Sequence, residues 1–124
     1  MISKKYEYNK KWRKKNKEKF NETMRKIMRK YRINALKIVG KGNIKCSNCG
    51  CDKVEILEIN HIKGGGCKEL NKGKDSYKFY KNIIKGSRNT DDLNILCHVC
   101  NHAYFVKQKY GIEYDIILKP SSIL

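Results

Sequence analysis

The amino-acid sequence predicts an α+β protein in which a basic N-terminal helix precedes a small body of short strands and helices. The first observation is charge: 29 Lys and Arg against 12 Asp and Glu give the 124-residue chain a net charge of +17. Residues 1–41 hold 16 Lys or Arg and three Glu, whereas residues 42–124 are nearly balanced. The other observations are two Cys-x-x-Cys pairs and short strand-like and helix-like segments around them. We therefore expect a basic helical arm over residues 1–41 and one domain over residues 42–124.

The arm has no Gly or Pro between Met1 and Val39, and Gly40 supplies a helix stop. We expect its second half to be an amphipathic helix docked on the body or on a partner. Residues 4–19 instead carry Lys and Arg on every side, so we expect them to fray in isolation and to become ordered on a polyanion. The alternative is a solvated tail with no specific role. The apolar face of the second half is formed by Phe20, Met24, Ile27, Met28, Tyr31 and Ala35.

The body is predicted to contain two short strands and two helices. Val54–Ile59 is rich in β-branched residues, which favours a strand, and a glycine-rich loop follows over residues 63–68. Later segments show helical spacing and end at glycines. The first predicted strand contains residues 54–59 and continues to its end at His61. The other predicted elements are a strand over residues 93–96 and helices over residues 75–85 and 98–110.

The two Cys-x-x-Cys pairs are the most informative local feature of the body. Each pair forms a knuckle in which two thiolates converge on one ion, and two knuckles supply the four soft ligands that tetrahedral zinc prefers. A redox role is disfavoured because no thioredoxin-like βαβ pattern surrounds the pairs, and Cys51 and Cys67 are interpreted as bystanders. The predicted ligands of a structural Zn²⁺ are Cys46, Cys49, Cys97 and Cys100.

Charge and hydropathy restrict the class of protein. No apolar run approaches the roughly 20 residues of a membrane span, and the first residues have no hydrophobic stretch behind their charges. These features argue against a membrane protein and against a secreted one, so a cytoplasmic location is expected. The strong positive charge indicates a polyanionic partner, most often nucleic acid. We expect phosphate contacts from Lys10, Lys11, Arg13, Lys14, Lys15, Lys63 and Lys68.

Polar residues framed by the two knuckles point to a catalytic site. His61 follows Asn60 at the end of the first strand, and Asn101 comes directly after the second cysteine pair. The second knuckle could bring Asn101 back against Asn60 and His61, which would place two amide oxygens beside one imidazole. Hard oxygen ligands suit Mg²⁺ or Mn²⁺. A neutral imidazole can take a proton from an attacking water molecule.

Over roughly residues 44–110 the chain resembles the HNH endonucleases of the ββα-metal fold, most closely the small stand-alone proteins of phages, archaea and mobile elements. The resemblance is carried by Cys46-Ser-Asn-Cys-Gly50, Leu57-Glu-Ile-Asn-His-Ile-Lys-Gly-Gly-Gly66 and Asp91-Asp-Leu-Asn-Ile-Leu-Cys-His-Val-Cys-Asn101. It implies that His61 is the general base, that Asn60 and Asn101 hold the catalytic Mg²⁺ or Mn²⁺, and that zinc braces the fold. It also implies double-stranded DNA as the partner, a nick as the simplest product, and a monomer or homodimer.

The chain departs from the family pattern at two places. The commoner pair is Asp-His, and a neutral Asn60 should hold a divalent ion more weakly than a carboxylate does. The family's middle Asn usually lies five residues before the third cysteine, where this chain has Asp92, so that Asp92 or Asn94 would take its supporting role. His98 and His102 lie four residues apart on the last predicted helix and form an alternative pair for a transition metal.

The sequence thus predicts a metal-dependent DNA endonuclease that hydrolyses phosphodiester bonds. The first alternative is a zinc-stabilised nucleic-acid-binding module whose catalysis is weak or lost through Asn60. The second is an RNA-binding zinc ribbon, which explains the charge but not the Asn-His-x-x-Gly-Gly-Gly stretch. Divalent-ion-dependent nicking of a plasmid would separate the enzyme from both alternatives.

Overall fold

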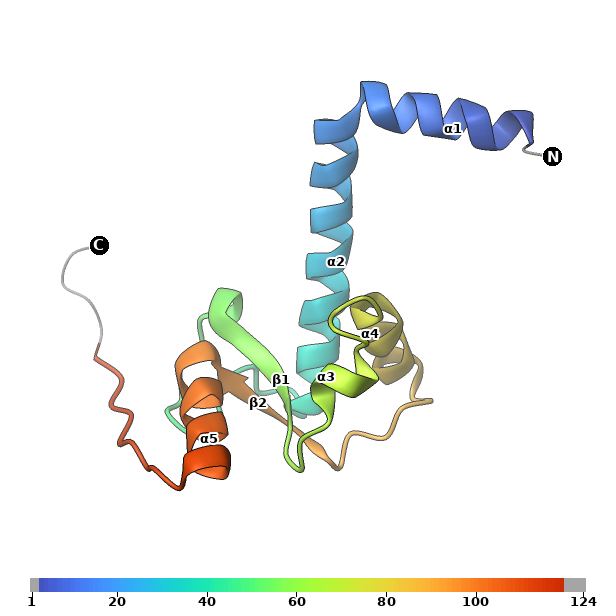
Figure 1. Ribbon diagram of the computed structural model, residues 1–124. Helices are drawn as coiled ribbons and strands as arrows, with labels where there is room; N and C mark the ends of the chain where they lie inside the picture. Colours follow the sequence, from blue (N-terminus) through green and yellow to red (C-terminus); the bar gives the residue numbers. More distant parts are fainter. Residues whose placement is uncertain (1–2, 120–124) are drawn as a thin grey trace.

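The computed structural model describes residues 3–119 and shows an α+β protein, as the sequence predicts (Figure 1). Two N-terminal helices lead into a body built on a two-stranded sheet. No helix among the described residues is long and apolar enough to cross a membrane. The elements in chain order are α1 (Lys4–Lys15), α2 (Lys17–Val39), the 3₁₀ turn η1 (Val54–Ile56), β1 (Leu57–His61), α3 (Gly66–Glu69), α4 (Ser76–Lys85), β2 (Leu93–Cys97) and α5 (His98–Tyr110).

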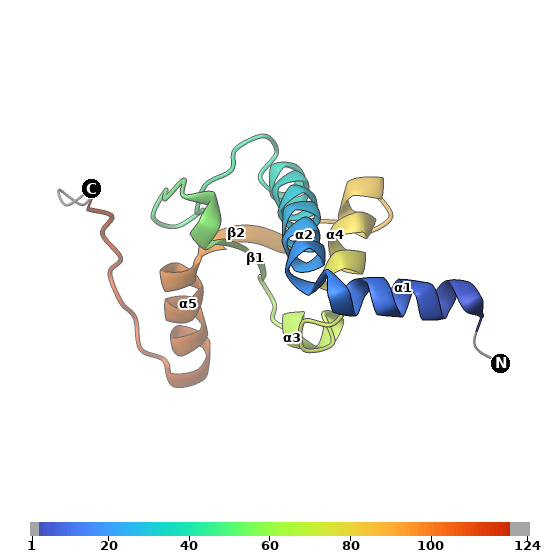
Figure 2. The ribbon, with the colours of Figure 1, turned by 90° about the horizontal axis from the view of Figure 1, so that it is seen from above.

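Strand β1 presents polar groups to two different surroundings. It pairs antiparallel with β2, and Asn60 lies opposite Asn94. Because successive side chains of a strand point to opposite faces, Glu58 and Asn60 lie on one face and His61 on the other. Helix α5 lies beside the first face, whereas α2 and α4 lie on the opposite side of the sheet (Figures 1 and 2).

The core of the body consists of two small clusters of buried residues. Both are limited in size, so a metal ion held by the cysteines would add substantially to the stability of the body. The first cluster, around the cysteines, joins α2, the sheet and α5 and contains Leu36, Cys46, Cys51, Leu57, Ile95, Leu96, Cys97 and Cys100. The second joins α2, α4 and β2 and contains Ala35, Phe79, Ile83 and Leu93.

Helix α2 docks on the body through the C-terminal part of its predicted apolar face, whereas Met24 and Ile27 of that face are exposed. Ala35 and Leu36 are fully buried. Tyr31 packs edge-on against Tyr77 of α4, with 4.9 Å between the ring centroids. The N-terminal half of α2 extends beyond the body and carries α1 at its end (Figure 1).

Helix α1 forms the first part of the expected helical arm, because Lys4–Lys15 are helical. The side chain of Ser3 accepts the backbone N–H of Tyr6 and caps the helix. No residue of α1 is buried. Its stability therefore comes from local hydrogen bonds and from an edge contact between Trp12 and Phe20 at the turn into α2.

The first strand begins three residues later than predicted, because Val54–Ile56 form a 3₁₀ turn. Arg32 of α2 explains the turn, since its Nη1 donates to the carbonyls of Val54 and Leu57 at 2.9 and 3.0 Å. The glycine-rich loop contains a further unpredicted element, the one-turn helix α3. The second strand and the two later helices lie within one residue of their predicted bounds.

Candidate functional site

Four cysteines form a candidate metal centre where the sheet, α5 and the loop before η1 meet. Cys46 and Cys49 lie in that loop. Cys97 ends β2, and Cys100 lies in the first turn of α5. The four Sγ atoms all lie within 4.8 Å of one another. Those of Cys49 and Cys97 are 3.8 Å apart, close to the separation required by a tetrahedral ion with metal–sulfur bonds of about 2.3 Å. The group could therefore hold a metal ion such as zinc.

Hydrogen bonds to the sulfurs prepare this group for a cation. Burial alone would raise the pKa of the Cys46 thiol, but backbone N–H groups, first that of Cys49, lower it to about 6. Burial raises the pKa of Cys49 and brings that of Cys100 to about 12. The lowered pKa of Cys46 favours the thiolate, the form of sulfur that binds metals, and metal binding to thiol ligands releases protons.

The other two cysteines lie outside this group, as expected of bystanders. Cys51 is buried in the core beside Cys46, whose N–H donates to the Cys51 carbonyl at 2.8 Å. Cys67 is exposed in α3. Neither sulfur belongs to the set of four that share a site.

A cleft of about 650 Å³ lies between β1, the glycine-rich loop and α5. Asn60, His61 and Asn101, the residues predicted for the catalytic site, all line it. Their hydrogen bonds run to other side chains rather than to one another: His61 to Glu69, Asn60 to Asn94 and Asn101 to Glu58. The structure thus gathers the predicted residues around one cavity, and each has a separate support.

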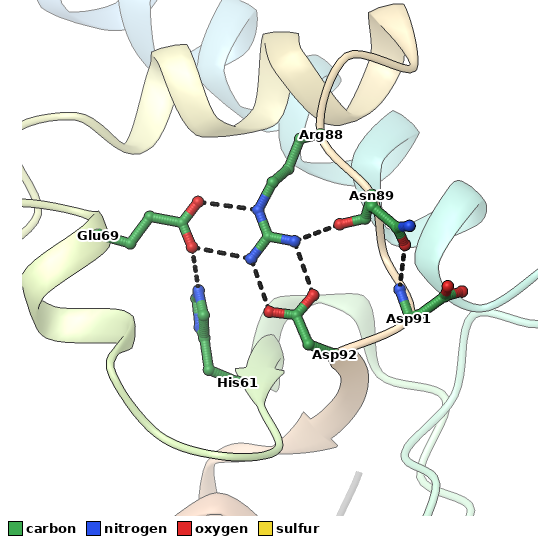
Figure 3. Close-up of polar contacts among 6 residues, drawn as sticks. All are labelled: His61, Glu69, Arg88, Asn89, Asp91 and Asp92. Carbon is green, nitrogen blue, oxygen red and sulfur yellow. Dashed lines mark hydrogen bonds and ion pairs between the residues drawn. The ribbon is translucent and has the colours of Figure 1, made fainter.

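His61 is held by charged side chains on the α4 side of β1 (Figure 3). Its Nε2 lies 2.8 Å from Oε1 of Glu69 in α3, and its ring stacks on Phe79 with 5.4 Å between the centroids. Because a carboxylate only accepts hydrogen bonds, Nε2 carries the proton of the neutral ring and Nδ1 keeps a lone pair. The contact therefore selects the tautomer that can accept a proton at Nδ1.

Arg88 fixes the carboxylate that orients His61 (Figure 3). Its Nε and Nη2 donate to the two oxygens of Glu69, each at 2.9 Å, and Nη1 and Nη2 donate to Asp92 at 2.6 and 2.9 Å. The carbonyl of Asn89 accepts a further bond from Nη1. These bonds from Arg88 lower the pKa of both carboxyl groups, and the carboxylates raise the pKa of the guanidinium. Glu69 therefore stays ionised at neutral pH and remains an acceptor for His61.

The glycine-rich loop comes close to the other ring nitrogen of His61. A Cβ atom on Gly66 would lie 2.6 Å from His61 Nδ1, which is too close for two unbonded atoms. Gly65 has a φ of 88°, in the left-handed region that favours glycine, and it begins α3. The two glycines therefore act differently: Gly65 makes the turn, and Gly66 lets the backbone approach the His61 ring closely.

Asn60 lies on the opposite face of β1 and has its own support. Its Nδ2 donates to Oδ1 of Asn94 across the sheet at 3.0 Å, which directs the Oδ1 of Asn60 away from Asn94. Asp92 contacts the loop through its backbone, whose carbonyl accepts the N–H of Ile62 at 2.9 Å. The two residues considered for one supporting role thus support different parts: Asn94 orients Asn60, and Asp92 anchors Arg88 and the loop.

Glu58 shares this face with Asn60 and has no role in the sequence-based prediction. Its carboxylate accepts hydrogen bonds from Nδ1 of His98 and from Nδ2 of Asn101, both in the first turn of α5. The available signal was the two-residue spacing of Glu58 and Asn60, which places both side chains on one face of a strand. His102, the partner of His98 in the alternative metal pair, has its ring near Phe105, 6.3 Å away between centroids, and also lines the cleft.

The basic side chains predicted to contact phosphate lie in two separate places. Lys63 lines the cleft and Lys68 lies on α3, and both are exposed. The others lie on exposed α1, which projects from the far end of α2 (Figure 1): Lys10, Lys11, Arg13, Lys14 and Lys15.

Comparisons of the chain with protein families, with characterised proteins and with solved structures find no match. The function is therefore argued from the geometry of the cleft, from the cysteine group and from the distribution of charge.

Proposed function

We propose that this protein is a metal-dependent DNA endonuclease of the HNH type, which hydrolyses phosphodiester bonds. The observation that carries the proposal is the cleft, whose lining residues include Asn60, His61 and Asn101, together with the orientation of the His61 ring by Glu69. The succession of β1, β2 and α5, with four cysteines at their junction, supports a ββα-metal core.

In this proposal His61 is the general base. Its Nε2 is held by Glu69, so Nδ1 takes the proton from the water molecule that attacks phosphorus. Gly66 has no side chain to crowd Nδ1, where a Cβ would lie 2.6 Å away. The carboxylate of Glu69 also stabilises the positive charge that the ring acquires, because it lies 2.8 Å from Nε2.

Asn60 and Asn101 supply amide oxygens of the kind that a hard divalent cation such as Mg²⁺ or Mn²⁺ prefers. Such an ion, when bound, polarises the phosphate and stabilises the leaving 3′-oxygen. Asn94 prepares Asn60 for this role by accepting its N–H and directing its oxygen away from β2. The zinc proposed at the four cysteines is structural, because four sulfur ligands leave no open position for water.

The distribution of charge favours duplex DNA as the substrate of an intracellular protein. Lys63 lines the cleft, where its charge can contact a phosphate, and the basic residues of α1 can contact phosphates further along the duplex. A single cleft of this kind cuts one strand per encounter. A monomer would therefore nick, and a homodimer could cut both strands.

Conversion of supercoiled plasmid to the open-circular form tests the proposal. The zinc-loaded protein is incubated with plasmid and Mg²⁺, Mn²⁺, Ni²⁺ or Zn²⁺, with EDTA as the control. We expect nicking with Mg²⁺ or Mn²⁺ and none with EDTA. If no ion supported nicking, the proposed endonuclease activity would be refuted.

Substitution of His61 identifies the general base. His61→Ala should lower the nicking rate by roughly 10²–10⁴, the usual contribution of a positioned acid–base group, and should leave zinc content and DNA affinity unchanged. Gly66→Ala should also slow nicking, because its Cβ would occupy the space beside Nδ1. The matched control is His102→Ala, which removes another imidazole of the same cleft and should have little effect. Nicking by His61→Ala at the wild-type rate would remove His61 from the mechanism.

A second candidate, a nucleic-acid-binding module without catalysis, is favoured by one observation. Asn60 is neutral where the commoner family residue is Asp, so the cation would bind more weakly there. On this reading the protein binds duplex DNA or structured RNA without nicking it, and His61→Ala changes nothing measurable. Competition between the two nucleic acids would then identify the preferred partner.

A further inference from the structure

Among the described residues that line the cleft, Glu58 alone is acidic. It precedes Asn60 by two residues in β1, so both side chains emerge from the same face of the sheet. Asn60 brings no charge to a cation, whereas Glu58 brings a full negative charge to the same cavity. Glu58 therefore supplies, two residues earlier on the same face of β1, the carboxylate that position 60 lacks.

Two side chains of α5 converge on this carboxylate. Nδ1 of His98 contacts one oxygen of Glu58, and the amide of Asn101 contacts the other. His98 and Asn101 lie three residues apart and so occupy the same side of the helix. Asn101 can present its oxygen instead of its nitrogen by turning its amide over, because the two atoms are alike in shape. The three side chains then offer a carboxylate, an imidazole nitrogen and an amide oxygen, the last two gathered around the Glu58 carboxylate.

The cluster is open to solvent on the cleft side. The side chain of Glu58 is 35% exposed and that of His98 is 54% exposed. A cation bound there can keep water molecules in its remaining coordination positions, as Mg²⁺ and Mn²⁺ do in proteins. The cysteine group is separate from it, since its sulfurs are buried or half-buried in the core.

We propose that Glu58, His98 and Asn101 bind the divalent cation of the cleft, and that Glu58 supplies the negative charge that the neutral amide of Asn60 lacks. The proposal rests on the proposed function only for the catalytic use of the ion, because binding itself can be measured without DNA. The imidazole ligand also sets a preference. Nitrogen donors suit first-row transition ions better than Mg²⁺, so Mn²⁺ should bind more tightly than Mg²⁺.

A calorimetric titration of the zinc-loaded protein with Mn²⁺, in the absence of DNA, tests the site. Glu58→Gln should weaken Mn²⁺ binding by at least about tenfold, the smallest effect expected when a partner of a metal site is removed. The matched control is Glu55→Gln, which removes the same charge from η1, where Glu55 pairs with Arg29 outside the cleft. It should leave the affinity unchanged. Zinc content and circular dichroism verify that each variant is folded.

Two further variants examine the ligand set. His98→Ala should weaken Mn²⁺ binding and reduce the preference for Mn²⁺ over Mg²⁺, because it removes the nitrogen donor. Adding Asn60→Asp to Glu58→Gln should restore most of the lost affinity, because it returns a carboxylate to the same face of β1.

The outcomes separate this site from the proposed function. An unchanged Mn²⁺ affinity in Glu58→Gln would overturn the site, even if the wild-type protein nicks DNA. Mn²⁺ binding that depends on Glu58 in a protein that does not nick would retain the site and refute the proposed activity. Absence of Mn²⁺ binding by the wild-type protein would overturn the site and leave Glu58 as a hydrogen-bonded link between β1 and α5.

Discussion

Helix α1 and the body hold their shapes by different means. α1 has no buried side chain and depends on hydrogen bonds within the helix. The body has two buried clusters, and four cysteines gather at one of them. α1 also projects away from the cleft, which lies against β1 and α5 (Figure 1).

The two regions also differ in how their charged side chains are held. α1 carries seven Lys or Arg and one Glu, and within residues 3–119 none of the seven has an ion-pair partner. In the body, Arg88 binds two carboxylates, and one of these carboxylates orients His61. The comparison indicates that α1 supplies attraction for phosphate, whereas the body supplies groups held in fixed positions. Changes in α1 should therefore leave the positioned groups of the body intact, and changes in the body should leave the attraction of α1 for phosphate intact.

The largest effect is expected from loss of the metal centre. Cys97→Ala removes one of four ligands, and the free energy of binding structural zinc contributes directly to folding. The body should unfold, and the variant should purify without the roughly one zinc per chain expected of the wild type. Metal analysis and circular dichroism measure both. Because α1 has no buried contacts, its helical signal should not fall in step with that of the body.

Cys67→Ser is the control for this prediction. It removes a thiol that is exposed and outside the group of four, so zinc content and stability should stay at their wild-type values. Well-folded wild-type protein without any metal would show that the body does not need the ion and would contradict the prediction.

The second-largest effect is expected on the affinity for DNA, and it tests the role of α1. Deleting residues 1–15 removes the seven basic residues of α1 and leaves α2 intact. For every phosphate that the shortened protein no longer binds, the slope of log K against log[salt] should become less steep by about 0.9. Binding should therefore become weaker and less sensitive to salt, as measured by fluorescence anisotropy. The nicking rate at saturating DNA and low salt should not change.

A charge-preserving variant separates electrostatics from helix contacts. Replacing Lys10, Lys11, Lys14 and Lys15 with Arg keeps the charge and the helix propensity, so the salt slope should match that of the wild type. A deletion variant with the wild-type slope would show that α1 does not contact phosphate.

The sequence predicts the elements of the body where local signals are strong. The last helix closes at a glycine and directly follows the second strand, and both lie where expected. The prediction was wrong at Val54–Ile56, because Arg32 holds the carbonyls of that segment from a distant helix. The predicted helical arm is present, since α1 is helical although its lysines give no apolar stripe. Contacts between distant segments are not visible in local spacing.

The candidate site shows the same limit. Cys46, Cys49, Cys97 and Cys100 could be identified because two knuckles have a diagnostic spacing. Their convergence in the structure agrees with that reading. Glu69 and Arg88 could not be identified, since they meet His61 only after the loop and α4 fold back beside β1 (Figure 3).

The smallest expected effect concerns the ion pairs of the body. Arg88 lowers the pKa of Glu69 and of Asp92 below their ordinary values of 4.5 and 3.8. The folded protein therefore binds fewer protons at these groups than the unfolded chain does. Their stabilising contribution is complete above the ordinary pKa values and is lost as the pH falls through the lowered ones.

Arg88→Gln should remove this contribution, and its effect should depend on pH. At pH 7 the variant should melt a few degrees below the wild type, and the difference should begin to narrow near pH 4.5 and narrow further as the pH falls through the lowered pKa values of the two carboxyl groups. The control is Lys107→Gln, which breaks the exposed pair of Lys107 with Glu113 and should change the melting temperature little at any pH. Thermal unfolding at a series of pH values measures both variants against the wild type, so that any loss of zinc in acid is common to all three. A difference for Arg88→Gln that stays constant from pH 7 to pH 4 would show that Arg88 stabilises the body by packing on Phe79 rather than through its two carboxylates.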